Sequence, residues 1–240
     1  MSATLTRRVA AEFVGTAFLL AAVVGSGIMA ERLANGSFAL ALLANAIATG
    51  CALVALILAF APISGAHFNP VVTLAEALLG STPWSEVLPY TSAQILGALA
   101  GTAAPNLMFA LPAFFWSHHA RTGPAQWLGE FIATFGLVFV IWGSSRSWSR
   151  GTALAVGAYI TAAYWFTSST SFANPAVTLA RTLTDTFAGI RPRDALPFIV
   201  LEIVGGVAAA IFVRWLAPAK APSTEDSRSS AEVPDISLTR

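Results

Sequence analysis

The amino-acid sequence alternates long apolar segments with short polar connectors. Six of the segments approach the roughly 20 predominantly apolar residues that a helix needs to cross a bilayer. They are residues 9–30, 38–60, 86–111, 127–143, 151–166 and 195–217. Two further stretches, 61–80 and 167–184, are moderately apolar and too short to span. The pattern predicts an all-α membrane protein with one transmembrane domain, residues 1–217, built from six transmembrane helices and two shorter elements.

Three short motifs recur in the same order about half a chain apart, which indicates an internal duplication. The pairs are Glu12-Phe13 with Glu130-Phe131, Asn69-Pro70 with Asn174-Pro175, and Glu86-Val87-Leu88-Pro89 with Asp194-Ala195-Leu196-Pro197. Each copy, residues 7–111 and 124–217, holds three long segments and one short one. Because three is odd, the second copy enters the membrane from the opposite face. We therefore expect an inverted repeat whose matching features meet near the bilayer midplane.

The two short stretches each place Asn-Pro after a run of small polar residues. Asparagine is a good helix N-cap, and proline is tolerated in the first helical turn. About ten helix-compatible residues follow, enough for roughly 15 Å, or half the hydrocarbon core. Irregular backbone at that depth is tolerated only inside protein or along a water-filled cavity. We expect two re-entrant half-helices that meet at the centre of a pore. The plainer alternative is that Asn69 and Asn174 only cap their helices.

The centre of such a pore has a definite polarity. Each helix N-terminus carries about half a positive charge. With asparagine amides in the lumen as well, a passing hydroxyl must present its oxygen to these donors, while cations are repelled and a chain of hydrogen-bonded water is interrupted. This arrangement favours neutral hydroxylated solutes.

Composition and charge exclude several classes of function. The 240 residues are 56% hydrophobic and 10% charged with a formal net charge of +1, so no basic surface suits nucleic acid. The single Cys51 cannot form an intramolecular disulfide or a multi-cysteine metal site. No zinc-protease or hydrolase nucleophile motif occurs. We expect no enzyme activity, no cofactor and no metal.

The two chain ends carry further signals. Arg7 and Arg8 before an apolar run resemble a secretory signal, but the length of that run and its counterpart in the second copy favour a permanent span. Residues 218–240 hold seven charges and are predicted to be a disordered tail. Eight Lys and Arg residues lie in the two termini and in the connectors that share their side of the membrane, against five in the other connectors. Because positive residues are more frequent on the cytoplasmic side, this count predicts that both termini are cytoplasmic.

The chain resembles the major intrinsic protein family, the aquaporins and aquaglyceroporins, over about residues 6–217. The resemblance is carried by Ser64-Gly65-Ala66-His67-Phe68-Asn69-Pro70-Val71-Val72-Thr73-Leu74, by Ser171-Phe172-Ala173-Asn174-Pro175-Ala176-Val177-Thr178-Leu179, by the two Glu-Phe motifs and by Ala93-Gln94-Ile95-Leu96-Gly97-Ala98. It implies a multi-pass protein of a bacterial-type inner (plasma) membrane, assembled as a homotetramer with one pore per subunit.

The resemblance also implies roles for single residues. The pore motifs would be Asn69, Pro70 and Val71 in the first copy and Asn174, Pro175 and Ala176 in the second. Glu12 and Glu130 would be buried structural residues that accept hydrogen bonds from the re-entrant loops. His67 would pack behind its loop, the alternative being that it senses pH near the pore.

Members of this family select solutes at an outer constriction of four residues. We locate the four positions in this chain by counting residues from Asn69 and Asn174. They are Thr49, Ala162, Ser171 and Val177. Family members usually have arginine in the last position, where this chain has valine. Arg181 lies four residues further on and is expected to pair with Asp185, the alternative being that its side chain reaches the pore. The constriction should therefore be wide, mildly polar and without large aromatic side chains.

These features predict a passive channel for water and small uncharged solutes. A wide filter suits glycerol, urea and metalloid hydroxides such as arsenite and methylated arsenicals. The expectation for the metalloid hydroxides rests on the family resemblance alone. The alternative is a proton-coupled secondary transporter of a small neutral solute that uses the intramembrane glutamates, since ionisable groups inside spans are functional candidates.

Overall fold

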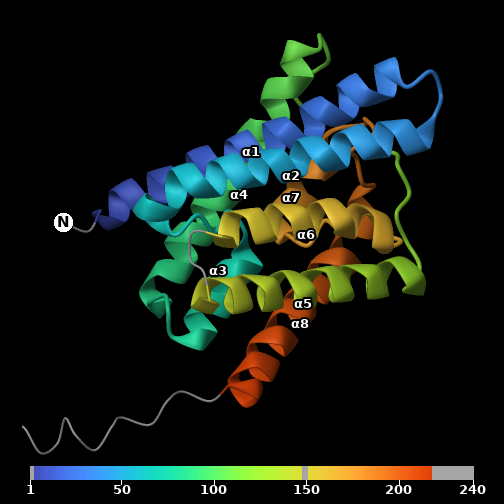
Figure 1. The fold of residues 1–240 in the computed structure, drawn as a ribbon. Coiled ribbons are helices and arrows are strands. Elements are labelled where there is room, and N and C mark those ends of the chain that lie inside the picture. The colour runs from blue at the N-terminus through green and yellow to red at the C-terminus, as the bar shows by residue number, and fades with distance from the viewer. Residues whose placement is uncertain (1–2, 148–150, 218–240) are drawn as a thin grey trace, which may run out of the picture.

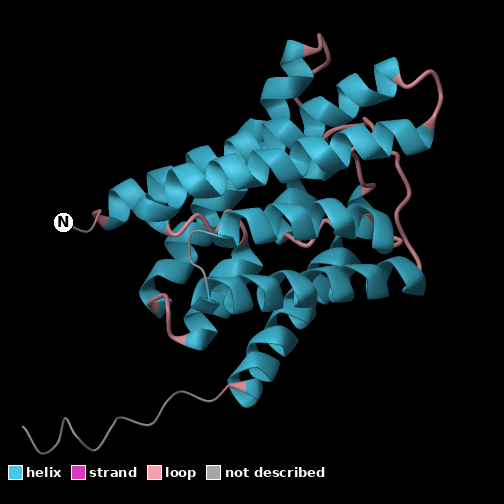
Figure 2. Ribbon diagram, in the orientation of Figure 1, coloured by secondary structure: helices cyan, strands magenta, loops and turns pink. Residues whose placement is uncertain are grey.

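The computed structural model describes residues 3–147 and 151–217, and every regular element in these ranges is a helix (Figure 2). The six predicted spans form the six long helices. These are α1 (Leu5–Leu33), α2 (Phe38–Ser64), α4 (Trp84–Met108), α5 (Pro124–Ser147), α6 (Thr152–Phe166) and α8 (Pro192–Leu216). The predicted all-α architecture is confirmed, while the predicted tail, residues 218–240, lies outside the described residues.

The two short stretches form half-helices that begin where the sequence predicts. α3 spans Pro70–Leu79 and α7 spans Pro175–Ala180, each with proline in its first turn and asparagine as N-cap. α3 has the expected ten residues and ends at Gly80, whose φ of 84° is left-handed. α7 is shorter than predicted because the chain tightens into a 3-10 turn, η2, at Arg181–Leu183.

The long helices differ in how well they suit lipid. By length and composition, α1, α2, α5 and α8 can each cross a membrane. α4 has 25 residues but contains Pro89 and Pro105 together with three fully buried polar side chains, Gln94, Thr102 and Asn106. α6 has only 15 residues. The latter two helices therefore rely more on contacts inside the protein.

The two halves of the chain interlock around the half-helices (Figure 1). α1 packs on α2 and α4 in the first half, and α5 packs on α6 and α8 in the second. Contact between α2 and α6 joins the halves, while α3 packs against α8 and α7 against α4. Each half-helix is thus held by the last long helix of the other copy, so both half-helices lie near the centre of the molecule.

Glycine allows the first and last helices of each copy to approach closely. A Cβ at Gly97 of α4 would overlap the Phe13 carbonyl of α1, and a Cβ at Gly205 of α8 would lie 2.6 Å from the Phe131 carbonyl of α5. These two pairs are equivalent in the internal repeat. Small residues at such crossings are typical of helices packed in membranes.

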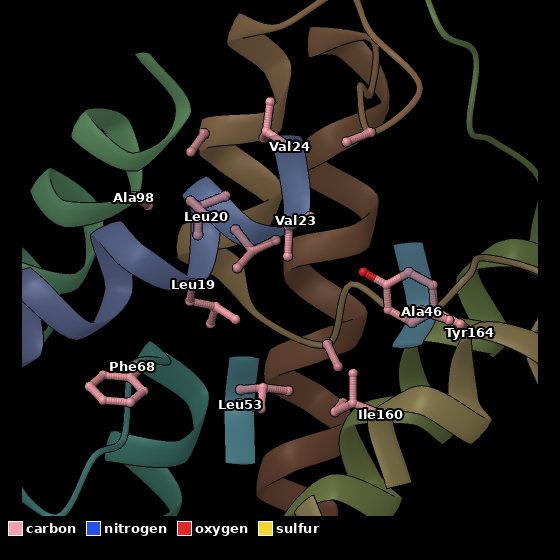
Figure 3. Close-up of a cluster of buried hydrophobic side chains, with 14 of the residues drawn as sticks. Leu19, Leu20, Val23, Val24, Ala46, Leu53, Phe68, Ala98, Ile160 and Tyr164 are labelled. Carbon is pink, nitrogen blue, oxygen red and sulfur yellow. The ribbon is translucent and has the colours of Figure 1, made fainter. Parts of the chain in front are cut away.

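Apolar side chains from both halves gather at the centre of the fold (Figure 3). Leu19 and Val23 of α1, Leu53 of α2 and Ile160 of α6 are buried and border the central cavity described below. Because such walls offer a solute no hydrogen bonds, recognition depends on the few polar groups among them.

Candidate functional site

The loops that precede the two half-helices share one backbone conformation. In each loop the residues four, three and one before the asparagine have positive φ. They are Gly65, Ala66 and Phe68 before Asn69, and Thr170, Ser171 and Ala173 before Asn174. A left-handed residue other than glycine costs about 1–2 kcal/mol. The two copies therefore share the same strained backbone conformation in their loops. Such strain persists only where surrounding contacts hold the backbone in place.

Glu12 of α1 holds the first loop in this conformation. Its carboxylate accepts hydrogen bonds from the backbone N–H of His67 at 3.0 Å and of Phe68 at 2.7 Å, and from the Ser64 hydroxyl at 2.6 Å. The glutamate is 0% exposed. A buried carboxylate whose oxygens are occupied in this way stabilises the loop and has no lone pair directed at a solute.

Glu130 of α5 holds the second loop in the same way. Its two oxygens accept hydrogen bonds from the N–H of Phe172 at 2.9 Å and of Ala173 at 2.7 Å. Glu12 and Glu130 thus occupy equivalent positions in the repeat, and each binds backbone N–H groups of the loop in its own copy.

Each glutamate has a further buried polar neighbour, and here the copies differ. Gln94 of α4 donates to Glu12 at 2.8 Å and to the Thr73 hydroxyl at 3.0 Å. The equivalent of Gln94 in the second copy is Glu202 of α8, which accepts from the Thr178 hydroxyl at 2.6 Å. Glu202 is an ionisable group inside a long apolar segment, and its hydrogen bond to Thr178 makes it part of the framework behind the second loop.

The two asparagines tie the loops together. Each Oδ1 accepts the N–H two residues further on, at 2.9 Å for Asn69 and 3.0 Å for Asn174. The Asn69 Nδ2 then donates to the Ala173 carbonyl at 2.7 Å, and the Asn174 Nδ2 to the Phe68 carbonyl at 2.8 Å. Both residues are therefore more than caps. The second hydrogen of each Nδ2 remains available beside the cavity, which both asparagines line.

One continuous cavity of about 780 Å³ passes between the halves and past both asparagines. We call the part beside Ala3 and Arg8 its inner end, and the part beside Val177 and Arg181 its outer end. The three buried glutamates of the framework do not border it. These three carboxylates therefore lie behind the loops, whereas Glu76 and Glu86 line the cavity.

His67 lies differently from the sequence-based expectation. The side chain is only partly buried and lines the cavity, with Nδ1 3.1 Å from the Thr73 hydroxyl and the ring 5.4 Å from that of Tyr90. The expected packing behind the loop is wrong because the left-handed residues on either side turn the His67 N–H toward Glu12 and leave the imidazole beside the cavity.

The outer end holds three of the four residues predicted for the constriction. Thr49, Ser171 and Val177 line the cavity and are at most 5% exposed. Ala162 does not line it and lies exposed on the outside of α6. Tyr164 lines the cavity instead, and its hydroxyl is 3.3 Å from the Thr49 hydroxyl.

This difference has a simple geometric cause. Two residues along a helix rotate a side chain by about 200°. Residues 162 and 164 therefore face opposite sides of α6. Counting residues back from Asn174 selected Ala162, whereas the residue that lines the cavity is Tyr164. Tyr164 was missed although it carries a polar group in an apolar helix, and the prediction that the constriction lacks a large aromatic side chain is wrong.

Arg181 also departs from prediction, because it does not pair with Asp185. Asp185 accepts hydrogen bonds from the N–H of His118 at 2.8 Å and from its ring at 3.0 Å. Burial alone would raise the pKa of the Asp185 carboxyl, but the amide and ring of His118 lower it. Arg181 begins the 3-10 turn, so the four-residue spacing of an α-helix is not continued, and its side chain turns inward to line the cavity.

A pair of substitutions on α6 tests which face borders the pore. Tyr164→Ala removes both a ring and the hydroxyl that contacts Thr49, so we expect a several-fold rise in the permeability of a five-carbon polyol such as xylitol. Ala162→Leu adds bulk on the exposed face and should leave xylitol and water permeability unchanged. Stopped-flow light scattering of reconstituted vesicles measures both. Equal effects of the two substitutions would contradict the corrected constriction.

Comparisons with known proteins agree with this geometry. The family model described as "Major intrinsic protein" matches residues 1–171 and 126–237. Aquaglyceroporin AqpS of Rhizobium meliloti (strain 1021) is 55% identical over 212 residues, covering 88% of this chain and 91% of that protein. Aquaporin NIP1-1 of Oryza sativa subsp. japonica is 35% identical over 219 residues, covering 87% and 74%.

The fold has a close structural counterpart as well. The X-ray structure of the aquaglyceroporin from Plasmodium falciparum superposes with a TM-score of 0.69 at 21% sequence identity, covering 87% of this chain and 95% of that one. Six transmembrane helices and two half-helices account for the whole described fold. The chain therefore belongs to the major intrinsic protein family, and it is a multi-pass membrane channel of the aquaporin and aquaglyceroporin type rather than an enzyme.

Proposed function

We propose that the channel conducts water together with neutral solutes of glycerol and urea size, and that metalloid hydroxides such as arsenite and methylated arsenicals belong to the same class. The observation that carries this proposal is the constriction. Val177 is apolar and of medium size, and it occupies the position where most family members have arginine. Unlike an arginine, it is too short to extend across the lumen.

The chemistry of these solutes fits the groups that line the cavity. Glycerol, urea and arsenous acid are uncharged near neutral pH and present several oxygen atoms. The asparagine amides and the Thr49, Tyr164 and Ser171 hydroxyls offer hydrogen bonds at a few points along apolar walls. Tyr164 limits the width on one side, which sets an upper size for the solute.

The assembly and placement of the chain follow the family. We propose a homotetramer in a bacterial inner (plasma) membrane with both termini cytoplasmic. The large apolar side chains exposed on the outside of the helices suit contact with lipid and with neighbouring copies; examples are Phe18, Leu88, Leu196 and Trp215.

The direct test is a panel of solutes on purified protein in vesicles. Stopped-flow measurements with water, glycerol, urea and arsenite should each show faster equilibration than protein-free vesicles. Water flux without faster equilibration of glycerol, urea or arsenite would contradict the proposal. Flux of glycerol and urea without arsenite would contradict only its metalloid part.

A further inference from the structure

The outer end of the cavity holds a buried arginine that forms no ion pair with any carboxylate of the described residues. Arg181 is 2% exposed and lines the cavity. Its guanidinium lies 3.4 Å from the ring centroid of Phe172, and its Nε donates to the Ala188 carbonyl. Within residues 3–147 and 151–217, no group accepts a hydrogen bond from either Nη atom.

The acidic groups of this region are engaged elsewhere. Asp185 binds His118, and Asp194 binds Arg191 through two hydrogen bonds of 2.9 and 3.0 Å. The buried glutamates behind the second loop accept hydrogen bonds from loop amides and a threonine hydroxyl. None of these carboxylates forms an ion pair with Arg181.

A second arginine strengthens the positive field. Arg121 lies 5.1 Å from the same Phe172 ring. Among the described residues its guanidinium donates only to the carbonyls of Phe187 and Gly189 and to the Thr170 hydroxyl. Two guanidinium groups therefore lie against one aromatic ring without a carboxylate partner between them.

The inner end of the cavity shows the opposite arrangement. There Arg8 forms an ion pair with Glu86, and both residues line the cavity. The cavity-lining arginine at the inner end thus has a carboxylate partner, and the one at the outer end has none. Because an unpaired charge in a low-dielectric site is costly, the exception at Arg181 points to a ligand or water that completes its hydrogen bonds.

A second polar group at the same end also has no partner. The Ser171 hydroxyl is buried, lines the cavity and makes no hydrogen bond to the described part of the chain. A guanidinium offers donors in a planar fork that matches a carboxylate, and such charge-assisted hydrogen bonds are about twice as strong as neutral ones.

We propose that Arg181 and Ser171 form a binding site at the outer end of the pore for the carboxylate or similar oxyacid group of a small solute. Arg181 supplies the charge and two donors, and Ser171 supplies a hydroxyl. Arg181 lies one helical turn beyond Val177, and Ser171 belongs to the constriction itself, so the site overlaps the outer side of the constriction. A bound acid anion therefore obstructs the entry of neutral solutes, an expectation that rests on the proposed channel function.

The experiment compares glycolate with glycolamide, its uncharged analogue of the same size. In the purified full-length protein, glycolate should raise the midpoint of thermal unfolding and glycolamide should not, because only a ligand of the folded state stabilises it. In vesicles, glycolate should slow urea entry. Arg181→Gln should raise the glycolate concentration for half-inhibition by about tenfold, and Arg181→Lys should give an intermediate value. Arg193→Gln, an exposed arginine on α8, is the matched control and should behave as wild type.

The outcomes separate this site from the channel function. The site is overturned if glycolate neither shifts the unfolding midpoint nor slows urea entry. It is also overturned if glycolamide acts like glycolate, or if Arg181→Gln keeps the wild-type response. Vesicles that conduct no urea in the absence of glycolate would contradict the proposed function, and the unfolding midpoint would still decide the site. Should Arg181→Gln fail to fold, the Arg181→Lys and glycolamide comparisons remain decisive.

Discussion

Val177→Arg is expected to lower glycerol and urea permeability by about tenfold or more, while water permeability changes by no more than about threefold. The substitution places a long cation at the narrow outer end, where Thr49, Tyr164 and Ser171 already border the lumen. Water is small enough to pass a filter that excludes a three-carbon polyol. Stopped-flow light scattering on vesicles with equal amounts of wild-type and variant protein measures both rates.

Val177→Thr provides the matched control, because threonine has nearly the same volume as valine. We expect it to keep glycerol and urea flux close to wild type. The new arginine would lie four residues from Arg181, a spacing at which like charges repel. The thermal unfolding midpoint of each variant therefore has to be measured alongside. A folded Val177→Arg channel with unchanged glycerol flux would show that position 177 does not set the size limit.

Glu12→Ala is expected to have the second large effect, a loss of stability and of all conduction. It removes the acceptor of the His67 and Phe68 amides, the Ser64 hydroxyl and the Gln94 amide, all of which stay buried or partly buried. Each unsatisfied buried donor costs about 1–3 kcal/mol. A total loss of about 4 kcal/mol, the lower end for four donors, corresponds to a fall of about 8–16 °C in the unfolding midpoint for a chain of this size.

Glu31→Ala is the control for this experiment, since Glu31 lies on the same helix and is exposed. Its unfolding midpoint and water flux should match those of wild type. A Glu12→Ala protein as stable and conductive as the Glu31→Ala protein would mean that the loop keeps its left-handed backbone without the carboxylate. The framework described here would then be wrong.

Much of the fold follows from the sequence because it depends on long patterns. All six spans and both half-helices begin within a few residues of the predicted positions, since apolar runs and Asn-Pro caps are local signals. The internal repeat gives the topology as well, because an odd number of spans per copy requires inversion.

The details of the constriction depended on information that the sequence does not display. Residues 162 and 164 differ by about 200° around α6, so an error of two positions in an offset exchanges an exposed residue for one that lines the cavity. Arg181 turned inward because the half-helix tightens after Ala180, and its expected partner Asp185 bound His118 instead. His67 depended on left-handed backbone angles that composition does not reveal.

The same geometry bears on the alternative of a proton-coupled transporter. Such a mechanism needs a carboxylate that meets the solute and exchanges protons with both sides. Glu12, Glu130 and Glu202 do not border the cavity and hold hydrogen bonds to the loops or to Thr178. A passive channel uses these carboxylates only to hold its pore in place.

The most direct test of this account is the concentration dependence of urea entry into proteoliposomes, measured with and without a protonophore. A passive channel predicts that the initial rate rises linearly with the urea gradient and is unchanged by the protonophore or by an imposed pH gradient. Entry that saturates steeply and collapses when the protonophore is added would contradict the account and establish coupled transport.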